Sequence, residues 1–169
     1  IGAGDRYVKF TLPSSGDSQV ELIDTPGLDE VDGETRAALA EQIANRADLI
    51  LFAIAGDMTQ VEHTALSQLR EVGKPILLVF NKIDQYPQAD RMAIYQKIRD
   101  ERVKELLSPD EIVMAAASPM TKKAIVRPDG TRSVQLSHGQ PQVEELKLKI
   151  LEILHREGKA LVALNTMLY

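Results

Sequence analysis

The chain has 169 residues, of which 44% are hydrophobic, and this is enough for one domain with a buried core. Its net charge is −5, with 20 basic and 25 acidic residues mixed along the chain, so there is no clustered basic face of the kind that binds nucleic acid. It contains no cysteine, which excludes disulfides, thiol nucleophiles and thiolate zinc sites. No secretory signal and no bilayer-spanning apolar run is visible, so we expect a cytoplasmic protein.

Apolar and polar residues are arranged so that strands alternate with helices along the chain. From the N-terminus, the pattern predicts strands at residues 7–12, 20–23, 48–55, 75–80 and 111–117. It predicts helices at residues 33–46, 61–72, 89–107 and 142–156, the last ended or kinked at Gly158. Turn residues at 13–18 join the first two strands, and a second hairpin at 123–136 turns at Pro128-Asp129-Gly130.

This alternation implies a three-layer α/β/α fold with a mostly parallel sheet, in which the first hairpin contributes one antiparallel edge strand. No internal repeat or low-complexity linker interrupts the pattern. Ligands of open α/β sheets bind beyond the carboxyl ends of the strands, which points to the loops at residues 24–33, 81–88 and 117–122.

The second of these loops opens with Asn81-Lys82-Ile83-Asp84. The two oxygens of the Asp84 carboxylate match the N1–H and the exocyclic amine of guanine, whereas adenine has no N1–H and no amine at C2. Asn81 can hydrogen-bond the base and tie neighbouring loops together, and the Lys82 stem can lie over the face of the base. An ordinary polar turn is the alternative interpretation, because Asn, Lys and Asp are all common in turns.

The first loop opens with Asp24-Thr25-Pro26-Gly27 at the end of a strand. Asp24 is suited to hold Mg²⁺ through a water, because this ion keeps several waters and bridges phosphates. Gly27 has no side chain, so its backbone can approach a phosphate oxygen and donate its N–H. Asp-x-x-Gly alone is equally well explained as a turn. It gains specificity because one strand–helix–strand–helix–strand stretch separates it from Asn81.

The third loop follows a run of small residues, Ala115-Ala116-Ala117-Ser118. Small residues at the end of a strand let backbone N–H groups approach the carbonyl of a base, so Ala116, Ala117 and Ser118 are candidate nucleotide contacts. An alanine run is usually explained by packing, and this candidate therefore depends on the other two loops.

Together the three loops resemble those of the Era-like branch of small GTPases, in a bacterial family whose GTPase domain precedes a membrane-associated domain. The resemblance covers residues 6–158. It implies a site for GTP or GDP with Mg²⁺, with Asp24 at the metal and Gly27 at the terminal phosphate. It implies that residues 27–46 are the mobile switch segment. The residues that it implies for reading the base are Asn81, Lys82, Asp84 and, through its backbone, Ala117.

The sequence departs from the GTPase pattern at Leu28, which follows the switch glycine where many GTPases carry a glutamine. That glutamine orients the attacking water, and an apolar side chain cannot do so. Water would have to be positioned by a partner, by a dimer, by a monovalent cation or by another polar group. No catalytic residue is therefore assigned beyond the switch residues Thr25, Gly27 and Leu28. The nearby Glu30, Asp32 and Glu34 fit a solvated helix start.

A second departure is the absence of any Gly-x-x-x-x-Gly-Lys-[Ser/Thr] segment, the loop that cradles the phosphates and supplies a lysine to them. In the family this loop, the strand before it and the first switch precede everything seen here, so we expect the chain to begin just after the first switch. The Gly2-Ala3-Gly4 start has no lysine and is no substitute. We expect the strands ending at Asp24 and Ile54 to lie roughly 9–10 Å apart, with another strand between them.

We expect residues 1–157 to form a partial GTPase domain and residues 158–169 to begin an apolar C-terminal segment. This segment fits either the end of a core-packing helix or the start of a membrane segment, and the resemblance favours the second. The full-length protein would then be peripheral to, or anchored at, a membrane. The hairpin at 123–136 is either a decoration of the sheet edge or a partner-docking element. The expected partners are guanine nucleotide, a membrane or membrane domain reached through the C-terminus and a second copy of the chain, with no nucleic acid indicated.

Two functions from different classes stay open. As an enzyme, the intact protein hydrolyses GTP to GDP and phosphate with Mg²⁺ as a slow conformational switch, while the 169-residue chain alone is expected to be inactive. As a binding module, it is a hydrolytically inert guanine-nucleotide adaptor at a membrane. Leu28 weakens the first function without excluding it, and Asp84 argues against an adenine-nucleotide protein.

Overall fold

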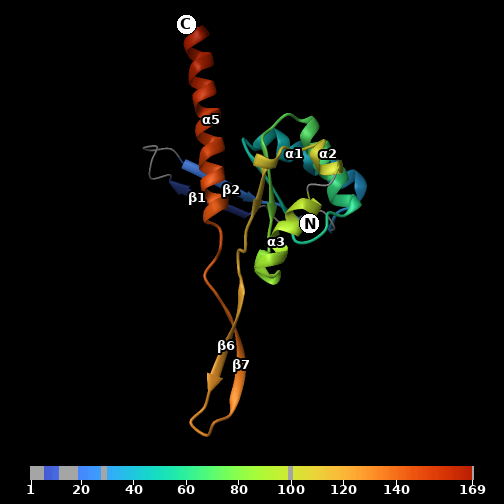
Figure 1. The fold of residues 1–169 in the computed structure, drawn as a ribbon. Coiled ribbons are helices and arrows are strands. Elements are labelled where there is room, and N and C mark those ends of the chain that lie inside the picture. Colours follow the sequence, from blue (N-terminus) through green and yellow to red (C-terminus); the bar gives the residue numbers. More distant parts are fainter. Residues whose placement is uncertain (1–5, 12–18, 28–29, 99–100, 169) are drawn as a thin grey trace.

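The computed structural model describes residues 6–11, 19–27, 30–98 and 101–168 (Figure 1). Its strands are β1 (Arg6–Thr11), β2 (Gln19–Asp24), β3 (Ile50–Ile54), β4 (Ile76–Phe80), β5 (Ile112–Met114), β6 (Met120–Val126) and β7 (Arg132–His138). Its helices are α1 (Gly33–Arg46), α2 (Gln60–Glu71), α3 (Gln88–Ile98), α4 (Glu101–Lys104) and α5 (Glu144–Leu168). Short 3₁₀ turns are η2 (Ile83–Gln85) and η3 (Pro109–Glu111). The predicted turn at 13–18 and Leu12 lie outside the described residues.

The parallel sheet β3–β4–β5 lies at the centre of the fold, with β4 between the other two strands. All five residues of β4 are buried, because helices cover both faces of the sheet. Leu78 and Phe80 join the core that α1 and α2 cover. Leu77 and Val79, on the opposite face, pack in one cluster with Ile153 of α5. The predicted three-layer α/β/α architecture with a parallel sheet is therefore confirmed.

Local capping explains where the helices of the first face begin. Asp32 is the N-cap of α1, and its carboxylate accepts a hydrogen bond from the Thr35 N–H at 2.8 Å. This backbone hydrogen bond holds the pKa of Asp32 below its ordinary value of 3.8. α2 begins with a capping box, in which Thr59 and Glu62 each accept a hydrogen bond from the other's N–H, at 3.2 and 2.7 Å.

β1 and β2 form an antiparallel pair that is not hydrogen-bonded to the parallel sheet. The register of the pair places Arg6 opposite Asp24 and Thr11 opposite Gln19. Among the described strands β2 and β3 do not pair, so the direct pairing that would contradict the predicted topology is not observed. Their separation of roughly 9–10 Å stays a prediction.

The ends of three elements differ from the expectations. The helix expected at 89–107 is described as α3 and α4, with residues 99–100 outside the described ranges, and α4 ends at Lys104. The strand expected at 111–117 is short, since the Ala116 N–H and C=O bond to Gln142 at 3.0 and 2.8 Å. α5 does not end at Gly158 but continues to Leu168, because glycine costs a helix only about 1 kcal/mol relative to alanine.

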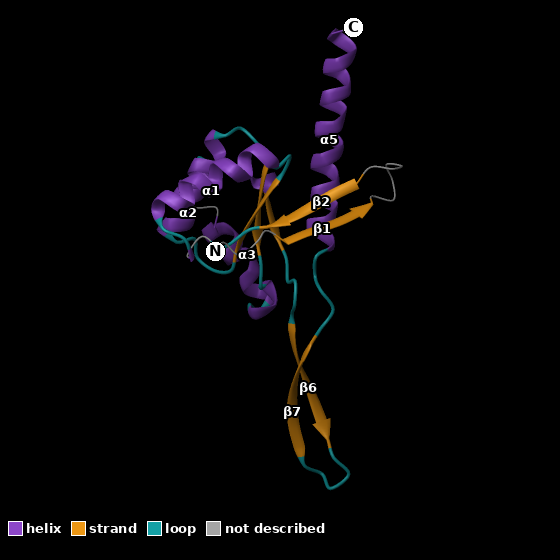
Figure 2. Ribbon diagram, turned by 180° about the vertical axis from the view of Figure 1, so that it is seen from behind, coloured by secondary structure: helices purple, strands orange, loops and turns teal. Residues whose placement is uncertain are grey.

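The β6–β7 hairpin and the C-terminal end of α5 project from the body in opposite directions (Figures 1 and 2). The hairpin is longer than the predicted 123–136, because its ladder runs from the Met120–His138 pair to the Val126–Arg132 pair. In the part of the chain that the structure describes, no helix is both long and apolar enough to span a bilayer.

Candidate functional site

The second loop follows β4 directly and is bonded to the segments on both sides. The Asn81 N–H donates to the Ile54 carbonyl at 2.8 Å, which extends the pairing of β3 and β4 by one residue. Ile83 is buried, and its N–H donates to the Ala115 carbonyl at 3.2 Å. The loop is thus held between β3 and the residues after β5, and the buried Ile83 anchors the turn.

Lys82 has a left-handed backbone, with φ 60° and ψ 30°. Among the described residues it is the only non-glycine residue with a positive φ. A side chain in this conformation costs roughly 1–2 kcal/mol, and such strain tends to persist at functional sites. The strained residue stands between Asn81 and Asp84, so strain coincides with the two side chains predicted to read a base.

Two hydrogen bonds join the second loop to the third. The Ala117 N–H donates to Asn81 Oδ1 at 3.1 Å, and the Met120 N–H donates to Asp84 Oδ2 at 3.1 Å. The predicted role of Asn81 as a tie between loops is therefore confirmed. Asp84 is half-buried, and an ionised carboxylate has acceptor sites beyond the one that Met120 uses.

The third loop divides into buried and exposed residues. Ala116 is fully buried, and its N–H donates to the Gln142 carbonyl at 3.0 Å, so it supports the loop from inside. Ala117 and Ser118 are exposed. Of the three predicted contacts in this loop, these two are the ones that a ligand can reach.

The base of the β6–β7 hairpin is bonded to the same loops, which the sequence did not indicate. Ser118 Oγ and His138 Nδ1 are 2.9 Å apart, and Met120, which binds Asp84, is opposite His138 in the hairpin. Met120 acts through its backbone N–H, so its residue type carries no signal. His138 is one of three histidines without metal-ligand spacing, so the sequence gives no sign of its bond to the third loop.

The first loop stands apart from the other two. Asp24 ends β2 and is exposed, as are Thr25 and Gly27, while Leu28 lies outside the described residues. The Glu30 N–H donates to the Gly27 carbonyl at 3.1 Å, and a Cβ atom at Gly27 would lie 3.6 Å from the Glu30 side chain. In the described ranges no hydrogen bond or ion pair links this loop to the second or third loop.

The donor set of the first loop fits Mg²⁺ only together with a bound nucleotide. In the described residues no three His, Cys, Asp or Glu side chains lie close enough to hold a metal ion. Mg²⁺ is commonly bound by one or two carboxylates together with water and substrate phosphates. Asp24 can supply one such carboxylate, and the phosphates of a nucleotide would complete the set.

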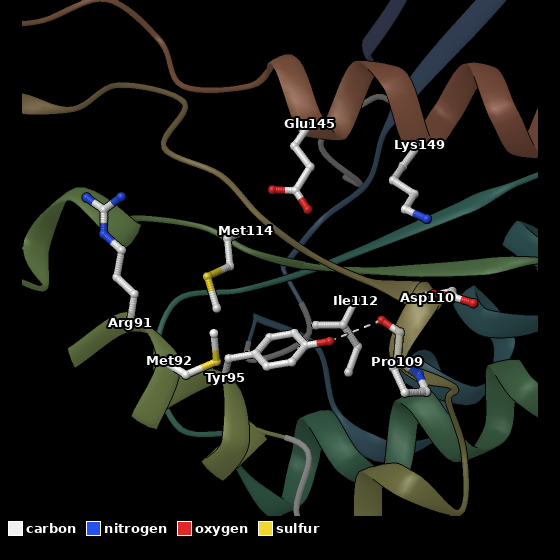
Figure 3. A pocket seen from close by; sticks show the side chains of 9 residues that line it. All are labelled: Arg91, Met92, Tyr95, Pro109, Asp110, Ile112, Met114, Glu145 and Lys149. Carbon is white, nitrogen blue, oxygen red and sulfur yellow. Dashed lines mark hydrogen bonds between the residues drawn. The ribbon is translucent and has the colours of Figure 1, made fainter. Parts of the chain in front are cut away.

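A separate shallow pocket of about 370 Å³ lies over β5, between α3 and α5 (Figure 3). Its lining residues are Arg91, Met92, Tyr95, Pro109, Asp110, Ile112, Met114, Glu145 and Lys149. The Tyr95 hydroxyl donates to the Pro109 carbonyl at 3.3 Å across one side of it. The pocket shares no residue with the three loops and presents charges of both signs, so it is distinct from the predicted nucleotide site.

A parallel sheet with helices on both faces and bonded loops at its carboxyl edge is the architecture of α/β domains that bind ligands at that edge. Residues 6–82 match the model of a family described as 50S ribosome-binding GTPase. GTPase Era of Clostridium kluyveri (strain ATCC 8527) is 34% identical over 98 residues, covering 53% of this chain and 33% of that protein. GTPase Era of Clostridium botulinum (strain Langeland) is 32% identical over 103 residues, covering 53% of this chain and 33% of that protein. GTPase Era of Clostridioides difficile (strain 630) is 34% identical over 88 residues, covering 48% of this chain and 29% of that protein.

These matches support an Era-like domain of the phosphate-loop GTPase class in this chain. The matched part of the chain spans about a third of the length of these relatives.

Proposed function

We propose that the full-length protein is a guanine-nucleotide switch that hydrolyses GTP to GDP and phosphate with Mg²⁺. The observation that carries this proposal is the pair of hydrogen bonds that fix Asn81 and Asp84 to the third loop, each 3.1 Å long. They orient an amide and a carboxylate before any ligand binds. Groups ordered in advance lose less entropy on binding, so the free energy of their contacts appears as affinity.

In this site the Asp84 carboxylate accepts hydrogen bonds from the N1–H and the exocyclic amine of guanine. Met120 supports one of its oxygens from the protein side. The stem of the exposed Lys82 lies over the face of the base, and the backbone of Ala117 and Ser118 approaches the base carbonyl. Selection of guanine over adenine follows from Asp84, because adenine offers neither donor.

On the phosphate side, Asp24 would hold Mg²⁺ and the Gly27 N–H would donate to the terminal phosphate. When bound, the metal supplies neutralisation of charge on the phosphates. Gly27 is linked to the start of α1 through the Glu30 N–H, which donates to its carbonyl at 3.1 Å. Loss of the terminal phosphate would therefore let Gly27 move, and this movement would be passed on to the switch segment at residues 27–46. The switch residues Thr25 and Leu28 lie at the beginning of this region.

The test of base recognition is Asp84→Asn in the full-length protein. Xanthine presents a carbonyl where guanine presents an amine, so the variant should lose affinity for GDP by about tenfold or more and gain it for XDP. Asp90→Asn, an exposed carboxylate at the start of α3, is the matched control and should leave both affinities unchanged. Unchanged GDP affinity in Asp84→Asn would remove Asp84 from the base edge.

A hydrolytically inert adaptor at a membrane is the second candidate, and Leu28 is the residue that favours it, since it cannot orient the attacking water. Single-turnover phosphate release from the full-length protein separates the two candidates. It is measured with and without potassium and liposomes. Release faster than that of free GTP under any of these conditions supports the switch. Release no faster under all of them supports the adaptor.

We also propose that residues 1–157 are the GTPase domain and that residues 158–169 lead into an apolar, membrane-associated part of the full-length protein. The protein would then work in the cytoplasm at a membrane surface. α5 carries the chain away from the body, opposite to the hairpin (Figures 1 and 2). A membrane reached through the end of α5 would therefore leave the β6–β7 hairpin pointing into the aqueous phase.

A further inference from the structure

The β6–β7 hairpin is a two-stranded ribbon, and no other described strand pairs with its outer edges (Figures 1 and 2). Its tip is closed by Asp129, whose carboxylate accepts hydrogen bonds from the Thr131 N–H at 2.9 Å and the Thr131 hydroxyl at 2.6 Å. An isolated two-stranded ribbon is marginally stable, and its free edges are templates for pairing with another strand. The hairpin therefore presents two candidate interaction edges.

The hydrogen-bond pattern decides which backbone groups of β7 face outward. The Arg127 N–H donates to the Thr131 carbonyl at 2.9 Å, and the Gly139 N–H donates to the Pro119 carbonyl at 2.8 Å, at the two ends of the ribbon. Residues 131 and 139 are therefore hydrogen-bonded to the β6 side. Because hydrogen-bonded and non-hydrogen-bonded pairs alternate along an antiparallel ladder, the odd-numbered residues of β7 bond to β6. The backbone groups of residues 132, 134, 136 and 138 consequently face the free edge.

The two edges differ in charge. β6 carries Lys122 and Lys123, and charged side chains on an edge strand oppose pairing with another chain. The centre of β7, Ser-Val-Gln-Leu-Ser at residues 133–137, has no charge and reads almost the same in both directions about Gln135. Val134 and Leu136 are 67% and 58% exposed. β7 is therefore the unprotected edge.

We propose that β7 pairs antiparallel with β7 of a second copy of this chain, about a two-fold axis at Gln135. In this register Val134 of each copy is opposite Leu136 of the other, and Ser133 is opposite Ser137. The outward-facing backbone groups of both strands meet, which gives about eight hydrogen bonds, two for each pair of such residues. Joining the hairpins makes a four-stranded sheet with the apolar side chains of both on one face.

A second copy fits this edge because its pattern is self-complementary, as an isologous contact requires. If β6 instead paired with β6 of a second copy about a two-fold axis at Lys123, the two Lys123 side chains would lie opposite each other, and like charges in that position are destabilising. RNA is a poor match, since residues 120–138 contain no Phe, Tyr or Trp to stack on bases. The inference goes beyond the proposed function and does not depend on bound nucleotide.

The first test is sedimentation velocity of the 169-residue chain from about 10 to about 500 µM, because one strand pair buries less than the roughly 1,200 Å² of a stable interface. We expect a weak, concentration-dependent dimer. Val134→Lys should abolish it. Val126→Lys is the matched control, since Val126 is 64% exposed on the same face of the ribbon but lies on β6, and it should leave the dimer intact.

The second test uses the absence of cysteine from the chain. Gln135→Cys places a thiol at a non-hydrogen-bonded pair on the axis, where Cα atoms about 4.5 Å apart suit a disulfide. Mild oxidation should yield a covalent dimer. In Ser133→Cys the two thiols would be about 14 Å apart, so this control should not cross-link. Circular dichroism verifies that each variant is folded.

Three results would each overturn the proposal. The first is a monomer at every concentration together with no more cross-linking in Gln135→Cys than in Ser133→Cys. The second is a dimer that Val134→Lys leaves intact, which would place the interface elsewhere. The third is equal loss of the dimer in Val134→Lys and Val126→Lys, which would indicate unspecific association through the apolar face.

Discussion

Lys82 adopts a left-handed backbone that glycine would adopt without penalty. Its side chain is exposed, and in the described part of the chain it takes part in no ion pair. Folding therefore gives no reason for a lysine at this position. Binding gives a reason for lysine, since the aliphatic stem of Lys82 would cover the face of a bound base. That contact would exist only in the complex.

Lys82→Gly should accordingly separate stability from binding. We expect the free energy of unfolding to rise by about 1 kcal/mol as the strain is relieved. Affinity of the full-length protein for GDP should fall by roughly fivefold, the equivalent of about 1 kcal/mol of contact with the ring. Urea denaturation and fluorescent-nucleotide titration measure the two effects. Lys82→Asn, which also tolerates this backbone, should bind as weakly; normal binding by both variants would contradict the contact with the base.

Asp84 and Asn81 could be selected from the sequence because their side chains match the chemistry of guanine directly after a buried strand. The hydrogen bonds that hold these two side chains in place could not be predicted from the sequence. Asp84 is fixed by the Met120 N–H and Asn81 by the Ala117 N–H, both from a loop 36 residues further along the chain. Backbone donors are the same in every residue except proline, so only the tertiary structure shows which ones are used.

At the scale of elements, α1 begins at Asp32, whose pKa lies below its ordinary value of 3.8 because the Thr35 N–H donates to it. A carboxylate with a lowered pKa in the folded state contributes stability above its unfolded pKa, and this contribution is lost as the pH falls through the folded pKa. Asp32→Ala should therefore lower Tm at pH 7.

The difference in Tm between the parent chain and Asp32→Ala should shrink as the pH falls below 3.8. Thermal denaturation by circular dichroism from neutral to acid pH measures this. Asp48→Ala changes an exposed carboxylate outside any helix and serves as the control, with a small effect at neutral pH. A constant difference for Asp32→Ala over the whole range would mean that the hydrogen bond to Thr35 does not stabilise α1.

The hairpin is bonded to the second and third loops, so under the proposed function changes at its base should reach the nucleotide. Met120→Pro removes the N–H that supports Asp84 while leaving the pairing of β6 with β7, since proline is tolerated at the first residue of a strand. We expect GDP affinity of the full-length protein to fall about tenfold, as for loss of a hydrogen bond to a charged group.

Lys122→Pro is the matched control, because the backbone of residue 122 also faces away from β7 but no hydrogen bond joins it to Asp84 in the described residues. It should leave GDP affinity unchanged. Equal affinities of Met120→Pro and Lys122→Pro would show that the hairpin base does not support the site.

At the scale of the whole molecule, the sheet is divided into the antiparallel β1–β2 pair and the parallel β3–β4–β5 sheet. Asp24 and Gly27 belong to the first part, and Asn81 and Asp84 to the second. In the described residues no hydrogen bond connects the two sets. The residues that we propose to read guanine are therefore held by hydrogen bonds to Ala117 and Met120, and in the described residues these bonds do not involve Asp24 or Gly27.

The 169-residue chain contains no Gly-x-x-x-x-Gly-Lys-[Ser/Thr] segment, which usually carries most contacts to the triphosphate. Isothermal titration calorimetry of this chain with GTP and Mg²⁺ should therefore detect no binding with a dissociation constant in the micromolar range or below. A dissociation constant of about 1 µM corresponds to about 8 kcal/mol of binding free energy. Micromolar binding would mean that the guanine side suffices for affinity. ATP is the control ligand and should not bind either.

The sequence by itself determined the layers of the fold and the residues that we propose to face the ligand. The layers and these residues can be predicted because both depend on the chemistry of side chains. An apolar run such as Ile76–Phe80 is stable only when it is buried on both faces, and the Asp84 carboxylate needs hydrogen-bond donors. Only the tertiary structure decided where β5 and α5 end, that the hairpin base bonds to Asp84 and Ser118, and which edge of the hairpin is free. These features depend on backbone groups that meet across long stretches of chain, and the pattern of side chains does not encode their partners.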